Sequence, residues 1–263
     1  MLPADFLKLV AVLVAVSIGT EATLLAGIFH LDTVPYHLMH LVWMGVLVCG
    51  QLAVYRHARA QSLPGAGAAL ALGLGALSTG IGDFVNGAAS SVEPVSLKLT
   101  WALLLFGIGY ALYAVTIFRH AEPALRAASP AAYRWRYLVA LAFLVLNVVA
   151  WLQHVEAKVA GHDVLYYGSF IFNATIYVML PACAVWLAMA TRWSLGSIVV
   201  LIGAILIPYS DLVLFGSWLR GGDPAVPSFE LYAYNWILYF SGQALFAILP
   251  SLQMSGHLSA DKR

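Results

Sequence analysis

Charge is what this sequence lacks most: only 10% of its 263 residues are Asp, Glu, Lys or Arg, whereas 62% are hydrophobic. Soluble domains carry about 25% charged residues, because their surfaces face water. The mean hydropathy of +0.87 is too high for a soluble domain of this length. The chain is therefore predicted to be an integral membrane protein that uses lipid as its solvent.

Three further scarcities narrow the range of functions. The two cysteines, Cys49 and Cys183, both lie in apolar stretches, which excludes a disulfide framework. The net charge is +1 and no long basic run is present, so nucleic acid is not an expected partner. No lysine lies in the middle of an apolar run, which argues against a retinal Schiff base, and no HExxH, HxxxH or CxxC motif marks a metal site.

What the sequence has instead is a series of long apolar runs, and a membrane-spanning helix needs about 20 such residues. Eight spans are predicted, at residues 6–29, 34–56, 66–90, 95–118, 134–155, 166–190, 193–219 and 231–252. The boundary in "AMATRWSLG" (188–196) is the weakest, and a merged span there would give seven helices. The predicted fold class is all-α, a polytopic helix bundle that forms a single transmembrane domain over residues 1–263.

The distribution of positive charge predicts the orientation. If the N-terminus is cytoplasmic, ten of the 13 Lys and Arg residues fall in cytoplasmic segments, and only Lys98, Lys158 and Arg220 fall outside. This asymmetry is the one that the positive-inside rule describes. We therefore expect both termini in the cytoplasm. The Ala-, Gly- and Leu-rich loops indicate a bacterial source, which makes the inner membrane the expected location.

The two halves of the chain are candidates for an internal repeat. Placing residues 1–120 over residues 134–252 aligns "TWALLLFG" (100–107) with "NWILYFSG" (235–242). The same shift brings "GDFVNG" (82–87) near "SDLVLFG" (210–216). Because each half holds an even number of spans, such repeats would be parallel and related by an axis along the membrane normal.

Polar residues gather in one layer of the predicted bundle. The acids Glu21, Asp83 and Asp211 each lie about 12 Å from the outer end of a span, at a rise of 1.5 Å per residue. A carboxylate in the hydrocarbon region costs on the order of 3 kcal/mol, so it normally faces a partner or a wet cavity. The layer therefore predicts a polar chamber that opens outward. The alternative is helix–helix hydrogen bonding combined with an aromatic belt.

The residue types in this layer suggest roles. Glu21, Asp83 and Asp211 are the candidate catalytic acids and bases. Imidazole together with carboxylate suits Zn, Cu or Fe, so the candidate metal ligands are His37, His40 and His154. The residues expected to orient a substrate are Asn86, Asn147, Trp151, Asn173, Tyr209 and Asn235. Haem is the weaker alternative, because only His40 and His154 offer two axial histidines from different helices at plausible depth.

Three classes of function remain open. The first is a membrane-embedded enzyme or redox subunit whose polar site faces the periplasm and acts on a lipid, a quinone or another small apolar molecule. The second is a proton- or ion-coupled transporter that uses the intramembrane carboxylates. The inner halves of the spans hold few polar residues besides Gln51, which disfavours a transporter. The third is a non-catalytic subunit of a larger complex, with a partner on the outer face.

Overall fold

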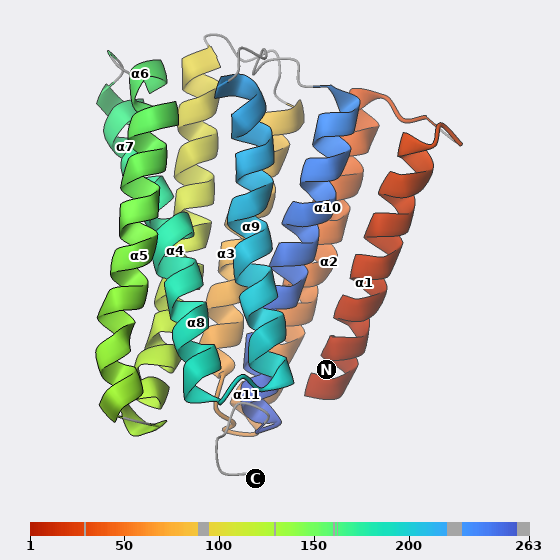
Figure 1. Ribbon diagram of the computed structural model, residues 1–263. Helices are drawn as coiled ribbons and strands as arrows, with labels where there is room; N and C mark the ends of the chain where they lie inside the picture. The colour runs from red at the N-terminus through yellow and green to blue at the C-terminus, as the bar shows by residue number, and fades with distance from the viewer. Residues whose placement is uncertain are drawn as a thin grey trace.

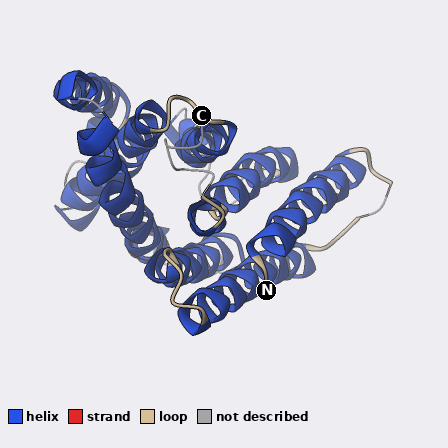
Figure 2. Cartoon of the chain, turned by 90° about the horizontal axis from the view of Figure 1, so that it is seen from below, coloured by secondary structure: helices blue, strands red, loops and turns tan. Residues whose placement is uncertain are grey.

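The fold is an all-helical bundle, as Figure 1 shows for the computed structural model. The structure describes residues 1–28, 30–88, 95–128, 130–159, 161, 163–219 and 228–256. Within these ranges the chain is helix and short loop, without a strand (Figure 2). The helices are α1 (Pro3–Leu25), α2 (Thr33–Ala60), α3 (Ala66–Ala88), α4 (Val95–Ala128), α5 (Pro130–His154), α6 (Glu156–Val159), α7 (Asp163–Asn173), the π-helix η1 (Ala174–Met179), α8 (Leu180–Ala190), α9 (Leu195–Leu219), α10 (Phe229–Phe246) and α11 (Leu249–Met254).

Eight segments of the described chain are long and apolar enough to cross a membrane, which confirms the predicted number of spans. They cover Pro3–Leu25, Val34–Ala60, Ala66–Gly87, Thr100–Ala127, Tyr133–Gln153, Asp163–Ala190, Leu195–Leu214 and Phe229–Met254. The boundary predicted within residues 188–196, between α8 and α9, is a tight turn. Arg192 and Trp193 adopt positive φ angles of 51° and 59°, and the Trp193 N–H donates to the Ala188 carbonyl over 2.7 Å. The α8–α9 pair is therefore two helices, and the seven-span alternative is wrong.

The sixth span is built from three pieces, α7, η1 and α8. The π-helix over Ala174–Met179 ends where the Leu180 N–H donates to the Thr175 carbonyl, five residues back. Pro181 follows and has no N–H to give to the Tyr177 carbonyl, which favours a wider turn just before it. Single π-helical turns inside α-helices frequently occur at functional sites. Here the wider turn repositions Tyr177 within the span.

The chain alternates direction, so α11 lies at the same end of the bundle as the start of α1 (Figure 1). We call this end proximal. The opposite end, which contains the last turns of α1 and α3 and the first turns of α2 and α10, is called distal. Glu21 lies four residues before α1 ends at Leu25, or about 6 Å from the end of that helix at 1.5 Å per residue.

Helix α1 contacts the bundle through one stripe. Its buried residues recur every three or four positions, which is the spacing of one helical face: Phe6, Val10, Leu13, Ser17, Glu21 and Leu24. The proximal half of the stripe is apolar. The distal half holds the buried polar side chains of Ser17 and Glu21, which must find partners on neighbouring helices.

Glycines bring α9 and α10 into backbone contact. A Cβ atom added to Gly203 would lie 2.7 Å from the Phe246 nitrogen and 2.9 Å from the Gly242 carbonyl oxygen. A larger residue at Gly203 or at Gly242 would therefore require one of the two helices to move. Small residues at helix contacts permit such close approach in membrane bundles. The contact places the polar side chains of α9 against those of α10.

Candidate functional site

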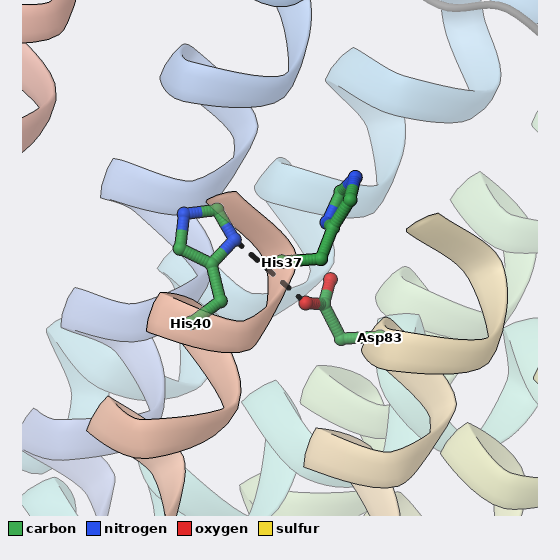
Figure 3. A group of neighbouring side chains, drawn as sticks. All are labelled: His37, His40 and Asp83. Carbon is green, nitrogen blue, oxygen red and sulfur yellow. Dashed lines mark ion pairs between the residues drawn. The ribbon is translucent and has the colours of Figure 1, made fainter. Parts of the chain in front are cut away.

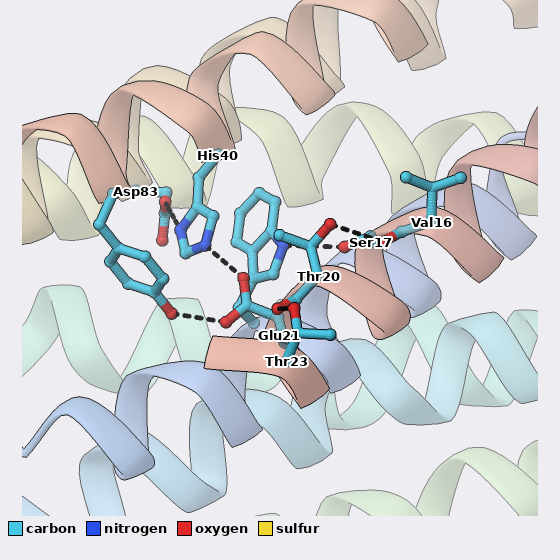
Figure 4. Close-up of polar contacts among 9 residues, drawn as sticks. Val16, Ser17, Thr20, Glu21, Thr23, His40 and Asp83 are labelled. Atoms are coloured by element: carbon cyan, nitrogen blue, oxygen red, sulfur yellow. Dashed lines mark hydrogen bonds and ion pairs between the residues drawn. The ribbon is translucent and has the colours of Figure 1, made fainter. Parts of the chain in front are cut away.

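Three helices contribute to a buried chain of ionisable groups at the distal end. The Nε2 atom of His40, on α2, lies 2.9 Å from Oε1 of Glu21 on α1. The Nδ1 atom of the same ring lies 3.9 Å from Oδ2 of Asp83 on α3. The Tyr36 hydroxyl donates to the second Glu21 oxygen over 2.9 Å. Figure 4 shows His40 between the two carboxylates.

The plane of the His40 ring is fixed by α10. Trp236 stacks on His40 with a centroid distance of 3.7 Å and an interplanar angle of 1°. The Trp236 indole N–H in turn donates to the Ser17 hydroxyl over 3.0 Å. Ser17 and Glu21, one turn apart on α1, therefore each bind one member of the stacked pair. The imidazole, carried by α2, is held by contacts from three other helices, α1, α3 and α10.

The second histidine of α2 completes the group. His37 is 2% exposed, and its ring lies edge-on to His40 at 5.9 Å and to Tyr232 at 5.1 Å between centroids. Ligand atoms of His37, His40 and Asp83 all lie within 4.8 Å of one another. Figure 3 shows these three side chains converging between α2 and α3. We call Glu21, Tyr36, His37, His40, Asp83 and Trp236 the distal cluster.

The packing of α3 against His37 depends on a glycine, which has no side chain. A Cβ atom added to Gly87, on α3, would collide with the His37 ring. Gly87 lies one turn beyond Asp83 on the same helix, so α3 supplies both the carboxylate of the group and the space for its second imidazole.

The distal cluster holds an excess of acidic groups. The two carboxylates, Glu21 and Asp83, are paired only with His40 among the ion pairs of the described residues, and the remaining pair joins Arg126 to Glu122. Glu21 is fully buried, while the Asp83 side chain is 12% exposed. Buried charges normally occur paired or bound to a metal. The cluster can therefore be balanced by bound protons or by a cation.

A second polar group lies deeper in the bundle, around Asp211 of α9. The carboxyl group interacts electrostatically with Asp83 and with the hydroxyls of Tyr110, Tyr177 and Tyr239. We call Asp211, Tyr110, Tyr177 and Tyr239 the Asp211 cluster. Oδ2 of Asp211 and the hydroxyl of Tyr110 have no hydrogen-bond partner among the described residues. Of the three predicted acids, Asp83 thus interacts electrostatically with both Glu21 and Asp211.

Two of the predicted asparagines lie on the helices that carry the distal cluster. Asn86 is one turn from Asp83 and 3% exposed, and its backbone carbonyl accepts a 3.5 Å hydrogen bond from Tyr232. Asn235 immediately precedes Trp236 and is 5% exposed. The side-chain Oδ1 atoms of both residues lack a hydrogen-bond partner among the described residues.

The other predicted residues lie elsewhere. Asn147 and Trp151 are buried on α5, where the Trp151 N–H donates to Ser169 of α7 over 3.2 Å. Asn173 is half-buried at the end of α7. Tyr209 is 53% exposed, so it faces away from the buried clusters. His154 is the last residue of α5, and its side chain lies outside the described part of the chain.

The structure adds residues that the sequence interpretation did not include. Tyr36 donates to Glu21, Trp236 stacks on His40, and Ser17 accepts from the Trp236 indole. A signal for Ser17 was available, because it lies four residues before Glu21 and so shares its helical face.

Comparison of the chain with protein-family models, curated proteins and solved structures found no match. Function is therefore inferred from the geometry of the site itself.

Proposed function

We propose that the protein is a membrane-embedded, metal-dependent enzyme whose metal ion is held by His37, His40 and Asp83. The observation that carries this proposal is the convergence of three buried donors with ligand atoms within 4.8 Å of one another. Ligands bound about 2.1 Å from one zinc or iron ion lie about 3–4 Å apart. Small side-chain rotations are enough to close the group around such an ion.

The hydrogen bond between His40 and Glu21 supports this assignment. Metal-binding histidines usually donate their second N–H to a carboxylate, which fixes the tautomer and orients the ring. With the proton on Nε2 and donated to Glu21, the Nδ1 lone pair of His40 points toward Asp83, at 3.9 Å. Glu21 is then a positioning residue, and Tyr36 holds its second oxygen.

The donor set favours zinc or iron(II). Two imidazoles and one carboxylate leave coordination positions open for water or substrate, as in catalytic zinc sites and non-haem iron sites. When bound, the ion supplies Lewis acidity, or redox chemistry if it is iron. It would also balance the charges of Glu21 and Asp83, which have no Lys or Arg partner among the described residues.

The location of the site indicates the substrate class. The ligands lie within spans 2 and 3, near the distal end, so the substrate we propose is a molecule dissolved in the bilayer. A quinone would suit an iron oxidoreductase, and a lipid would suit a zinc-dependent hydrolase or transferase. Asn86 lies one turn from Asp83, and its Oδ1 atom has no hydrogen-bond partner among the described residues, so we assign it the binding of a polar head group. From the positive-inside bias, we propose that the distal end faces the periplasm of a bacterial inner membrane.

The test is metal analysis of the purified full-length protein. The protein is stripped with a chelator, reloaded with Zn²⁺ or anaerobically with Fe²⁺, and its metal content measured. We expect stoichiometric uptake, lost in His37→Ala, His40→Ala and Asp83→Ala. Glu21→Gln should weaken metal affinity by about 10–100-fold without removing a ligand.

The matched control is His57→Ala. His57 lies in the last turn of α2, at the other end of the helix from His37 and His40, and should not affect metal uptake. A folded protein that takes up neither metal, or ligand variants that bind metal as the unmodified chain does, would show that the distal cluster is a structural contact between helices.

A further inference from the structure

The last span carries a polar stripe that crosses the bundle. From Asn235 onward, every fourth residue of α10 and α11 except one is polar: Asn235, Tyr239, Gln243, Ser251 and Ser255. The exception is Ala247, where α10 ends and its backbone carbonyl accepts a hydrogen bond from Gln51. The stripe covers 20 residues, or about 30 Å at 1.5 Å per residue, which is the thickness of the hydrocarbon core.

Most of the stripe is buried inside the bundle. Its span is the most buried of the eight spans in the described chain, and Ser255 at its end is half-buried. Asn235, Tyr239, Gln243 and Ser251 are each 5% exposed or less. Polar residues on a lipid-facing side of a helix would not be buried in this way. Because polar residues inside a membrane bundle are costly, their presence here indicates a function.

Hydroxyl and amide groups connect the stripe to neighbouring helices. The Tyr113 hydroxyl, on α4, donates to Oε1 of Gln243. The Tyr239 hydroxyl, one turn toward the distal end, is buried and has no hydrogen-bond partner among the described residues. Tyr239 contacts Trp236 at 5.6 Å between centroids, which links the stripe to the distal cluster.

Several polar atoms along this line lack protein partners. They are Oδ2 of Asp211, the Tyr110 hydroxyl, Nε2 of Gln243, Oε1 of Gln51 and Oγ of Ser251, all buried and without a hydrogen-bond partner among the described residues. Buried polar atoms of this kind are normally satisfied by internal water molecules. A row of such atoms beside hydroxyls that both donate and accept is what proton transfer requires.

We propose that the stripe and the Asp211 cluster form a proton pathway between the distal and proximal ends of the bundle. Asp211 is the carboxylate that carries the proton: it is buried on α9, and its Oδ2 atom has no hydrogen-bond partner among the described residues. It interacts electrostatically with the hydroxyls of Tyr110, Tyr177 and Tyr239. A proton taken up by one Asp211 oxygen leaves to a neighbouring hydroxyl or water, whose own proton passes on. Only O–H bonds form and break, so no oxidant or reductant is needed. Tyrosine hydroxyls suit this transfer better than binding of a metal cation, for which carboxylates and carbonyls are preferred.

The inner half of the bundle holds more polar contacts than the sequence predicted. The inner halves of the spans hold few polar residues, which disfavoured a transport route; the exception is Gln51. In the fold it meets the end of α10, while Gln243 meets Tyr113 one turn further toward the distal end. The inner half therefore holds polar groups from α2, α4, α10 and α11, with an interruption in the polar side chains of the last span at Ala247.

The experiment measures proton flux through the full-length protein in phosphatidylcholine vesicles. A potassium gradient with valinomycin sets the potential, and trapped pyranine reports internal pH, with a chelator present throughout. We expect flux above that of protein-free vesicles, lost to their level in Asp211→Asn and in Gln243→Leu. Asp211→Glu should retain flux, because it keeps a carboxyl group that can be protonated.

Thr116→Val is the matched control. Thr116 is buried on α4, one turn from Tyr113, but its hydroxyl is bonded to the Leu112 carbonyl of its own helix, so this variant should conduct like the unmodified chain. Flux no faster than in protein-free vesicles, or an Asp211→Asn variant that conducts normally, would overturn the proposal. Because the measurement is made without metal, its result is independent of the metal site: metal binding without flux would leave the proposed enzyme intact.

Discussion

The distal cluster and the Asp211 cluster both hold carboxylates inside the bundle, but they differ in how those carboxylates are satisfied. Both oxygens of Glu21 have hydrogen-bond partners, and both nitrogens of His40 face a carboxylate. Asp211, in contrast, has an oxygen with no partner among the described residues. The first arrangement suits a fixed site that holds a ligand in one geometry. The second suits a group whose partners are exchangeable water molecules and protons.

Removing the carboxylate from each cluster should have the largest and most unequal effects on stability. Glu21→Leu leaves His40 and Tyr36 buried without their acceptor, and breaking a buried pair in this way costs about 3–5 kcal/mol. Asp211→Leu removes a carboxyl group that lacks a full set of partners, so it should change stability by about 1 kcal/mol or less. The measurement is the free energy of unfolding of each purified variant in mixed detergent micelles.

Equal losses in the two variants would contradict the distinction between the clusters. A control for the change of shape is Glu21→Gln, whose amide oxygen can still accept from His40. It should therefore retain most of the stability that Glu21→Leu loses. If Glu21→Gln is as unstable as Glu21→Leu, the effect comes from charge and not from the lost hydrogen bonds.

Composition and periodicity were enough to predict the fold class and the number of spans, but not where each helix ends. The first span was predicted over 6–29, whereas α1 ends at Leu25. The helix stops there because Gly27 adopts a φ of 68° and the N–H groups of Gly27 and Ile28 return to the Leu24 and Thr23 carbonyls. A glycine inside an unbroken apolar run gives no such signal by hydropathy alone. The turn at Arg192 and Trp193 is equally hidden, since non-glycine residues rarely take positive φ.

The sequence predicted one polar layer, and in the structure its residues belong to separate groups. Glu21, His37, His40 and Asp83 were identified by type and depth, and they do meet. Depth alone could not separate them from Asn147 and Trp151, which lie on α5, where Trp151 contacts α7 instead. Which helices are neighbours depends on long-range packing, such as the glycine contact between α9 and α10. The internal repeat of residues 1–120 and 134–252 and the cytoplasmic termini stay predictions.

A smaller effect is expected from filling the space beside His37. Gly87→Ala puts a methyl group into the imidazole ring, and overpacking of this kind costs about 1–3 kcal/mol. Because the ring must move, metal affinity should fall together with stability. Gly45→Ala on α2 is the matched control, since its added Cβ would meet no atom within 4 Å. In a helix that substitution should stabilise by about 0.5–1 kcal/mol. Identical behaviour of the two variants would show that His37 is free to shift.

The smallest effect tests how firmly α10 holds the distal cluster. Trp236→Phe keeps an aromatic ring on His40 but removes the N–H that donates to Ser17, a loss of about 1 kcal/mol. Trp43→Phe makes the same chemical change at an indole N–H without a partner among the described residues, so it should cost less. The difference between the two unfolding free energies isolates the hydrogen bond, and combining Trp236→Phe with Ser17→Ala should add little further loss. If the double variant instead loses the sum of the two single effects, Ser17 and Trp236 act independently. The hydrogen bond then does not fix α1 against α10, and Glu21 is the α1 side chain that positions His40.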